Sequence, residues 1–315
     1  MLARAEIHNM LLKKLFRYTT LLTGNFEKIF QDVKIPTLPE VVTKILGKLR
    51  DPDVSAVEIA RLIQYDPGLT TQVLKVTNSP FAGLTKEITD LVQAVQVLGL
   101  KEVEAIVVSY GVNKVVQAPK VSGFDLRIFW TDSLLRALFA RELATERHQE
   151  GDKAFLIVLI QDIALPVLLT SWFDVYRRVY NTWQKEGGRL CYWERKLLSW
   201  DHAQAGAWVA KKWQLPDMLI CGIGLHTASA ENLLKLKLHQ TIIGVTNLSA
   251  HLPSIKENPP HLEVFCDYYK LYGIREEHIV KALQRAEELF LETATAFAMQ
   301  VFKAPIFSKL LTGGQ

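Results

Sequence analysis

The chain has 315 residues, a formal net charge of +4 and a hydrophobic fraction of 49%. The hydrophobic fraction excludes a disordered chain and indicates a sizeable core, and the near balance of charges does not indicate a nucleic-acid binder. The cysteines Cys191, Cys221 and Cys266 form no C-x-x-C pair, which is typical of reduced thiols in a cytosolic protein rather than of a disulfide framework.

The first residues predict an amphipathic helix, because apolar side chains recur at helical spacing among basic ones. Glu6, His8 and Asn9 interrupt the apolar segment that a signal peptide would need. We therefore expect residues 1–30 to form a helical extension that packs on its own protein, with a membrane-surface or partner-binding helix as the alternative. The apolar positions are Ile7, Leu11, Leu15, Tyr18 and Leu22.

Residues 31–118 predict a small lobe of short helices, because helix-boundary signals recur between apolar segments. No window alternates with period two, so no strand is predicted. We expect Val41 and Leu98 in the core, where an aspartate at either position would unfold the lobe. The signals are capping boxes at Thr37 with Glu40 and at Ser55 with Glu58, N-caps at Asp66 before Pro67 and at Thr89, and Gly99 ahead of a helix from about Lys101.

After a linker at residues 116–123, residues 124–303 predict a larger helical lobe, and residues 304–315 form a tail. The apolar segment Ala154–Thr170 is the best membrane candidate, but it carries Gln161 and Asp162 at its centre, where a charge costs about 2.5–3.5 kcal/mol. We expect a buried core helix and no membrane span. The predicted helices are Ile128–Arg147, Lys153–Thr170, Phe173–Glu186, Tyr192–Gln214, Pro216–Leu225, Leu233–Ser249 and Glu276–Phe302.

Val95–Ser109 superficially matches a helix-turn-helix, which makes a DNA-binding regulator one alternative. A recognition helix needs polar side chains that reach base edges. This segment offers Val103, Ile106 and Val107 instead, so we expect buried core and no nucleic-acid partner.

Four motifs in order resemble the opening of the HDOD family, the non-catalytic relatives of the HD phosphohydrolases. Their order and spacing are more specific than any one of them alone. The resemblance implies an all-α, multi-helix architecture, in which a small N-terminal helical lobe packs on a larger HD-related lobe. The motifs are Ile35–Val42 (IPTLPEVV), Asp66–Leu69 (DPGL), Lys75–Gly83 (KVTNSPFAG) and Ala94–Leu100 (AVQVLGL).

The resemblance continues through the larger lobe and covers roughly residues 34–251. Its motifs there are Trp130–Ser133 (WTDS), Leu159–Ala164 (LIQDIA), Asp201–Ala207 (DHAQAGA) and Lys212–Pro216 (KWQLP).

The same comparison implies that the metal centre of an HD phosphohydrolase is degenerate here. Such an enzyme holds its metal with two histidines and two aspartates, and the metal activates water. This chain has Asp132 at the first histidine, Gln161-Asp162 in place of His-Asp, and Asn247 at the later aspartate. We therefore expect no catalytic residues, no metal and no cofactor. The expected vestigial or ligand-binding pocket comprises Asp132, Gln161, Asp162, His202, His226 and Asn247.

Asp162 lies in an almost wholly apolar segment, so its carboxylate must point into the protein and must be paired. We expect a hydrogen-bonded cluster of Asp162, Gln161 and His202 that joins helices of the larger lobe, although Asp132, Asp162, His202 and His226 remain an open set of metal ligands.

The leading function is a non-catalytic regulatory protein of bacterial signalling in the cytoplasm, which acts through a protein partner in trans or a small-molecule or nucleotide ligand. The enzymatic alternative is a metal-dependent phosphohydrolase for a nucleotide or cyclic dinucleotide.

Overall fold

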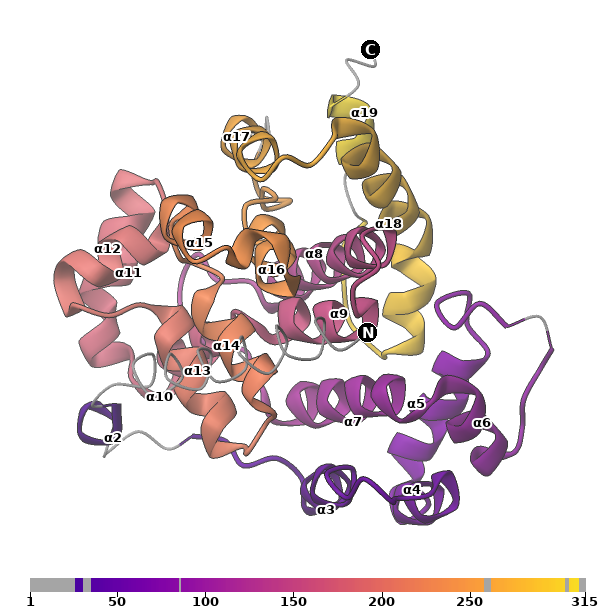
Figure 1. The fold of residues 1–315 in the computed structure, drawn as a ribbon. Coiled ribbons are helices and arrows are strands. Elements are labelled where there is room, and N and C mark those ends of the chain that lie inside the picture. Colours follow the sequence, from indigo (N-terminus) through magenta and orange to yellow (C-terminus); the bar gives the residue numbers. More distant parts are fainter. Residues whose placement is uncertain (1–25, 31–34, 85, 258–261, 304–305, 312–315) are drawn as a thin grey trace.

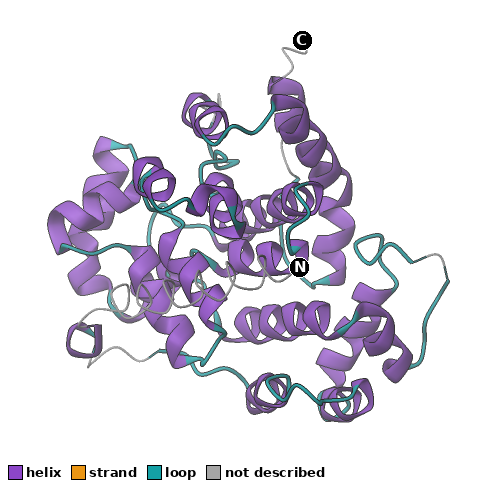
Figure 2. Ribbon diagram, viewed as in Figure 1, coloured by secondary structure: helices purple, strands orange, loops and turns teal. Residues whose placement is uncertain are grey.

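The computed structural model describes residues 26–30, 35–84, 86–257, 262–303 and 306–311. Over these residues the fold consists of helices and loops without strands (Figure 1, Figure 2). The all-α prediction is therefore confirmed. The apolar positions of the predicted N-terminal helix lie outside the described residues.

The first group of helices packs mainly on itself and contacts the rest of the chain chiefly through α7, which lies against α9. The interior of this group is apolar: α7 alone buries Val103, Ile106, Val107 and Val108. A helix buried in this way cannot enter a DNA groove as a recognition helix. The bounds are α3 (Glu40–Lys48), α4 (Ala56–Ile63), α5 (Pro67–Thr77), α6 (Leu91–Leu98) and α7 (Leu100–Val115), and α2 (Phe26–Ile29) precedes this group without being part of it.

Three predicted boundary signals are confirmed. Ser55 and Glu58 form the reciprocal capping box at the start of α4. The Asp66 carboxylate accepts a hydrogen bond from the backbone N–H of Leu69 at the start of α5. Gly99 has a φ of 78°, which suits its place between α6 and α7.

Two other boundary predictions are wrong. Thr37 and Glu40 form no capping box, because Pro39 occupies the N-cap with an extended backbone and α3 begins only at Glu40. At α6 the cap is Asp90 rather than Thr89, and its carboxylate accepts a hydrogen bond from a backbone N–H at 2.7 Å.

The core residue at the start of α3 is Val42, one position after the predicted Val41. Val41 and Leu98 are only half-buried, whereas Val42 is fully buried. Val42, Ile45 and Leu46 lie at the spacing i, i+3 and i+4 and share the buried face of α3, which leaves Val41 beside that face. An aspartate should therefore be far more damaging at Val42 than at Val41.

The second group of helices is arranged around α8, which packs on α9 and on α18 (Figure 1). The bounds are α8 (Leu126–Glu146), α9 (Gly151–Ile160), α10 (Ala164–Ser171), α11 (Phe173–Glu186), α12 (Leu190–Leu198), α13 (His202–Lys212), α14 (Asp217–Leu225), α15 (Ala230–Lys235), the 3-10 helix η1 (Leu238–Gln240), α16 (Ile242–Ser249), α17 (Glu263–Leu271), α18 (Glu276–Ala296) and α19 (Phe307–Leu311).

Three predictions of a long helix in this region are wrong, because the structure divides each predicted helix into shorter ones. The predicted helix from residue 153 turns at Gln161–Ile163. The one from residue 192 stops at Ser199, whose φ is 67°, and the one from residue 233 stops at Lys237, whose φ is 58°. Neither residue is a glycine, so the sequence carries no plain stop signal at either place.

The C-terminal region also differs from the prediction. α18 ends at Ala296 rather than near residue 302, and α17 was not predicted. The tail is docked over part of its length, since Phe307 is buried and Ser308 donates its backbone N–H and its hydroxyl to the Glu287 carboxylate.

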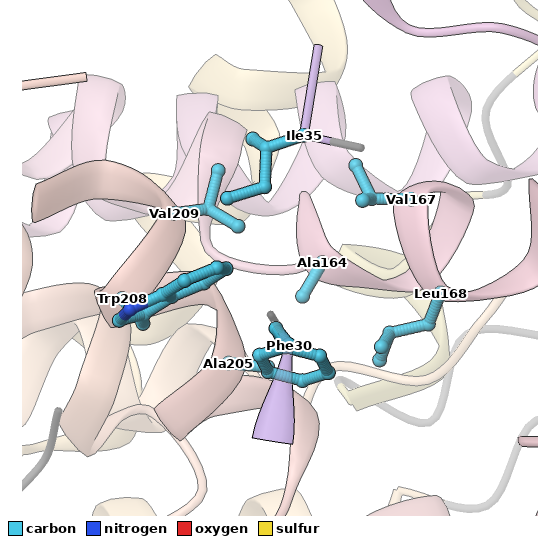
Figure 3. A pocket seen from close by; sticks show the side chains of 8 residues that line it. All are labelled: Phe30, Ile35, Ala164, Val167, Leu168, Ala205, Trp208 and Val209. Atoms are coloured by element: carbon cyan, nitrogen blue, oxygen red, sulfur yellow. The ribbon is translucent and has the colours of Figure 1, made fainter. Parts of the chain in front are cut away.

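Phe26 and Phe30, the aromatic residues of the first described segment, pack into an aromatic cluster on the second group. Phe30 lies 5.0–5.3 Å, ring centre to ring centre, from Trp172, Trp200 and Trp208. Figure 3 shows Phe30 and Trp208 among the apolar side chains that line this pocket. Phe26 and Phe30 are thereby held against the region of α10 and α13.

Among the described residues, Gly151–Ser171 is long and apolar enough to cross a membrane by length and composition. It comprises α9, the Gln161–Ile163 turn and α10, and 78% of its most apolar window is buried inside the fold. This burial is typical of a core segment, as the central Asp162 predicts.

Candidate functional site

Three polar side chains from separate parts of the larger helical group converge. Asp162 lies in the turn after α9, His202 begins α13, and His226 is the C-cap of α14. Oδ1 of Asp162 is 3.3 Å from Nε2 of His202 and 3.1 Å from Nε2 of His226, and the two Nε2 atoms are 3.2 Å apart. Their side chains are between 2% and 14% exposed, so the cluster is almost closed to solvent.

The local sequence explains how these side chains meet. Asp201 and Gln204 form a capping box that fixes the start of α13, so His202 occupies the first turn of that helix. Gly206 then lets α13 approach the turn after α9, since a Cβ there would lie 3.3 Å from the backbone oxygen of Gln161.

Glu194 is a member of the cluster that the sequence reading missed. It is fully buried on α12, and one carboxylate oxygen lies 2.6 Å from Nδ1 of His202 and 3.0 Å from its backbone nitrogen. The other oxygen accepts a hydrogen bond from the hydroxyl of Tyr176. Cys191 precedes Glu194 by three residues and is also buried, so helical spacing could have placed Glu194 on the inner face.

The hydrogen bonds assign roles to the ring nitrogens. Nδ1 of His202 faces Glu194, and Nδ1 of His226 lies 2.6 Å from the backbone oxygen of Ile223, so both nitrogens must donate. In neutral rings the two Nε2 atoms would then present lone pairs to each other and to the Asp162 oxygen. A cation must therefore lie among the three atoms, either a proton on a histidine or a metal ion.

The surrounding charges favour a proton on His202. Burial alone would lower the pKa of His202, but the Glu194 and Asp162 carboxylates outweigh it and hold that pKa well above its usual value. Burial alone would raise the pKa of Asp162, but His226 and His202 hold it well below its usual value. These surroundings favour an imidazolium between two carboxylates over a neutral His202 ring.

Arg136 on α8 brings a second cation to this cluster. Its Nη1 lies 3.8 Å from Oδ2 of Asp162. Its Nε and Nη2 donate to the backbone oxygen of Leu252 at 3.0 and 2.7 Å, which fixes the guanidinium in place. Arg136 was not singled out in the sequence, because nothing in its local pattern separates it from a surface arginine.

Asp132, expected in the same pocket, points toward a different partner. One carboxylate oxygen accepts a hydrogen bond from the Ser254 hydroxyl, and the other accepts from the backbone N–H of Ile255 at 2.8 Å. Burial raises the pKa of Asp132, although Arg136 and these hydrogen bonds oppose the shift. Asp132 therefore holds the segment after α16 and does not join Asp162, His202 and His226.

Asn247 is likewise committed to hydrogen bonds within the protein. Its amide nitrogen lies 3.0 Å from the backbone oxygens of His226 and Ala228, and its side-chain oxygen accepts from the Tyr272 hydroxyl at 2.7 Å. Asn247 thereby fixes the end of α14 that carries His226. An aspartate could not donate these bonds, so the asparagine is suited to this place.

Gln161 lies beside the cluster without completing it. Its side-chain nitrogen donates to Oδ2 of Asp162 at 3.4 Å, and its side-chain oxygen has no hydrogen-bond partner among the described residues. The contact between Gln161 and Asp162 is thus present, whereas no bond joins Gln161 to His202 in the part of the chain that the structure describes.

These positions do not rebuild the metal centre of an HD phosphohydrolase. Of the four positions matched to that centre, only Asp162 contacts the imidazoles of His202 and His226, because Asp132 and Asn247 are bonded elsewhere and the Gln161 amide donates to Asp162 instead. Asp162, His202 and His226 form a metal-like triad of their own, and their spacing fits ligands of one ion with bonds of about 2.0–2.2 Å. They are the described residues that could hold a metal.

Comparison with known proteins supports the family resemblance. The model of the HDOD domain matches residues 35–229. An uncharacterised protein of Treponema pallidum is 25% identical over 197 residues, which are 61% of this chain but only 37% of that protein. The chain thus spans little more than a third of the length of this curated relative.

Solved structures show the same fold. An HDOD domain protein of unknown function from Geobacter sulfurreducens matches with a TM-score of 0.60 and 20% identity over 88% of this chain and 99% of that one. A protein from Shewanella amazonensis, described provisionally as a phosphohydrolase, matches with a TM-score of 0.58 and 21% identity over 89% and 90%. A protein from Marinobacter aquaeolei, named provisionally for signal transduction, matches with a TM-score of 0.61 and 17% identity over 89% and 66%. Since the HDOD model covers well over half of the residues, the chain belongs to the HDOD family.

Proposed function

We propose that this chain is a non-catalytic regulatory protein whose histidine–carboxylate cluster braces the larger helical group instead of performing hydrolysis. Glu194, Asp162, His202 and His226 link α12, the turn after α9, α13 and α14, so the cluster joins four separate segments of the fold. The bracing role explains why charged groups are retained in a largely closed interior.

Arg136, the second cation at the cluster, gives this proposal its main support. It stands 3.8 Å from Asp162, and together with protonated His202 it balances the charges of Asp162 and Glu194. A metal-dependent hydrolase needs an open coordination position for water or substrate. Here a guanidinium fixed by Leu252 lies next to the carboxylate that would bind the metal.

A second candidate is a structural metal ion held by Asp162, His202 and His226. The nearly equal separations of the three ligand atoms favour it, as does the orientation of both imidazoles by Glu194 and by the backbone oxygen of Ile223. Such an ion would brace the same helices, so both candidates agree that the site supports structure.

The expected partner is a signalling protein that binds in trans, with a nucleotide or another small molecule as an alternative ligand. The expected location is the cytoplasm. The mostly buried Gly151–Ser171 segment supports a location off the membrane, and the names of some structural relatives supply the signalling context.

We expect the purified chain to hydrolyse neither nucleotides, cyclic dinucleotides nor generic phosphodiesters above background when manganese, iron or nickel is added. Product formation can be followed by chromatography, with Asp162→Ala assayed beside the wild type. Turnover that depends on the metal and disappears in Asp162→Ala, while Asp132→Ala retains it, would overturn the proposal.

A further inference from the structure

α12 and its N-cap carry exposed basic and aromatic side chains. Arg189, Tyr192, Arg195 and Lys196, together with Cys191, line a shallow groove on the surface. We call the first four residues the α12 stripe. Tyr192 is 55% exposed, and α11 and α12 lie together at the edge of the fold (Figure 1).

Two cations of the stripe lack carboxylate partners. The Arg189 side chain has no ion pair or hydrogen bond among the described residues, and Lys196 lies over aromatic faces, 5.5 Å from the ring centre of Tyr192 and 4.9 Å from that of Trp193. Exposed acidic groups on the same helical hairpin already have neighbours, since Asp174 pairs with Arg177 and Glu186 with Lys185. The stripe therefore keeps a net positive charge.

We propose that the α12 stripe binds an acidic peptide segment of a partner protein. This proposal rests on the regulatory function proposed above and names the chemistry of the partner. Charge complementarity selects acidic side chains, and the exposed Tyr192 between the cations offers the aromatic contact that protein interfaces favour.

The spacing of the cations favours an extended ligand over a single anion. Arg189 is the N-cap of α12 and Lys196 lies in its last turn, so the two cations stand near opposite ends of the helix, about 10 Å apart along its axis. Cations that bind one phosphate converge on a point, whereas these are spread along a line. Nucleic acid would need a broader concentration of basic residues than a chain with a net charge of +4 and acidic neighbours provides.

The stripe is physically connected to the buried cluster. Arg195 is 47% exposed at the groove, yet its Nε donates to the Asp201 carboxylate at 2.8 Å and its Nη2 donates to the Thr227 hydroxyl at 2.8 Å. Asp201 caps the helix that begins with His202, and Thr227 follows His226. A peptide bound along α12 therefore rests on the same helix and the same arginine that hold the cluster in place.

The test is binding of a short fluorescent glutamate-rich peptide to the full chain, measured by anisotropy at moderate salt. The double variant Arg189→Glu with Lys196→Glu should bind about tenfold more weakly or worse than the wild type. Arg195 is left unchanged, because its loss would disturb the helix cap at Asp201.

The matched control is Arg61→Glu with Lys75→Glu, which reverses one arginine and one lysine on exposed faces of α4 and α5. Both double variants change the net charge equally, so attraction to net charge alone would weaken them equally. The proposal predicts wild-type affinity for this control.

Four results would overturn the proposal: no peptide binding by the wild type, equal losses in the two double variants, competition by inorganic phosphate as effective as by the unlabelled peptide, or tighter binding of a single-stranded oligonucleotide. Peptide binding and hydrolysis are measured independently. Each of these four results can occur without hydrolytic activity, and hydrolytic activity can occur without loss of peptide binding. Failure of the peptide site is thus distinguishable from failure of the proposed non-catalytic function.

Discussion

Replacing Glu194 with alanine is expected to lower the free energy of unfolding by about 3–5 kcal/mol, as for other buried charge pairs that lose one partner. The carboxylate is fully buried and accepts from His202 twice and from Tyr176 once. Alanine would leave these donors in the interior without an acceptor, and the imidazolium would lose one of its two carboxylates. Chemical denaturation of the purified variant measures the loss.

Glu194→Gln should fall between the wild type and Glu194→Ala, because it keeps one acceptor oxygen but loses the charge. Glu292→Ala on α18 is the matched control, since Glu292 is exposed and should change the unfolding free energy by less than about 0.5 kcal/mol. An alanine variant at Glu194 that unfolds at the same denaturant concentration as Glu292→Ala would contradict the assignment of Glu194 to the cluster.

Val42→Asp should destabilise the first helical group by about 4 kcal/mol or more, because it places an unpaired carboxylate at a fully buried position. Val42 packs directly on α7: a Cβ on Gly111 would lie 2.9 Å from its Cγ1. No space remains for water to solvate the new charge. Thermal melting followed by circular dichroism shows the effect.

The control for this variant is the neighbouring substitution Val41→Asp, which makes the same chemical change at a half-buried position. We expect it to melt well above Val42→Asp. Equal melting temperatures for the two variants would mean that the inner face of α3 has been assigned to the wrong residues.

The sequence was sufficient for the fold class and for most helices, because apolar periodicity and caps such as Ser55 and Asp66 are local signals. It was insufficient where tertiary packing stops a helix. Ser199 and Lys237 adopt left-handed conformations that glycine would normally signal, and one long apolar segment hides the turn that carries Asp162.

The candidate site was predictable only in part for a related reason. Family resemblance identified Asp162, His202 and His226, but spacing along the chain could not show that they meet while Asp132 turns toward Ser254. Arg136 could not be recognised, since its importance arises from contacts with residues that follow it by 26 and more positions. Such long-range contacts leave no local pattern.

We propose that two cations of the protein itself, protonated His202 and the Arg136 guanidinium, hold the buried carboxylates together. The most direct test is the melting temperature of the full chain after treatment with a chelator, compared with the same protein after addition of zinc or manganese, with bound metal measured in parallel. We predict equal melting temperatures and metal well below one ion per chain. A metal that binds stoichiometrically and raises the melting temperature by about 3 °C or more, with the rise abolished in Asp162→Asn, would contradict the claim and assign the site to a bound ion.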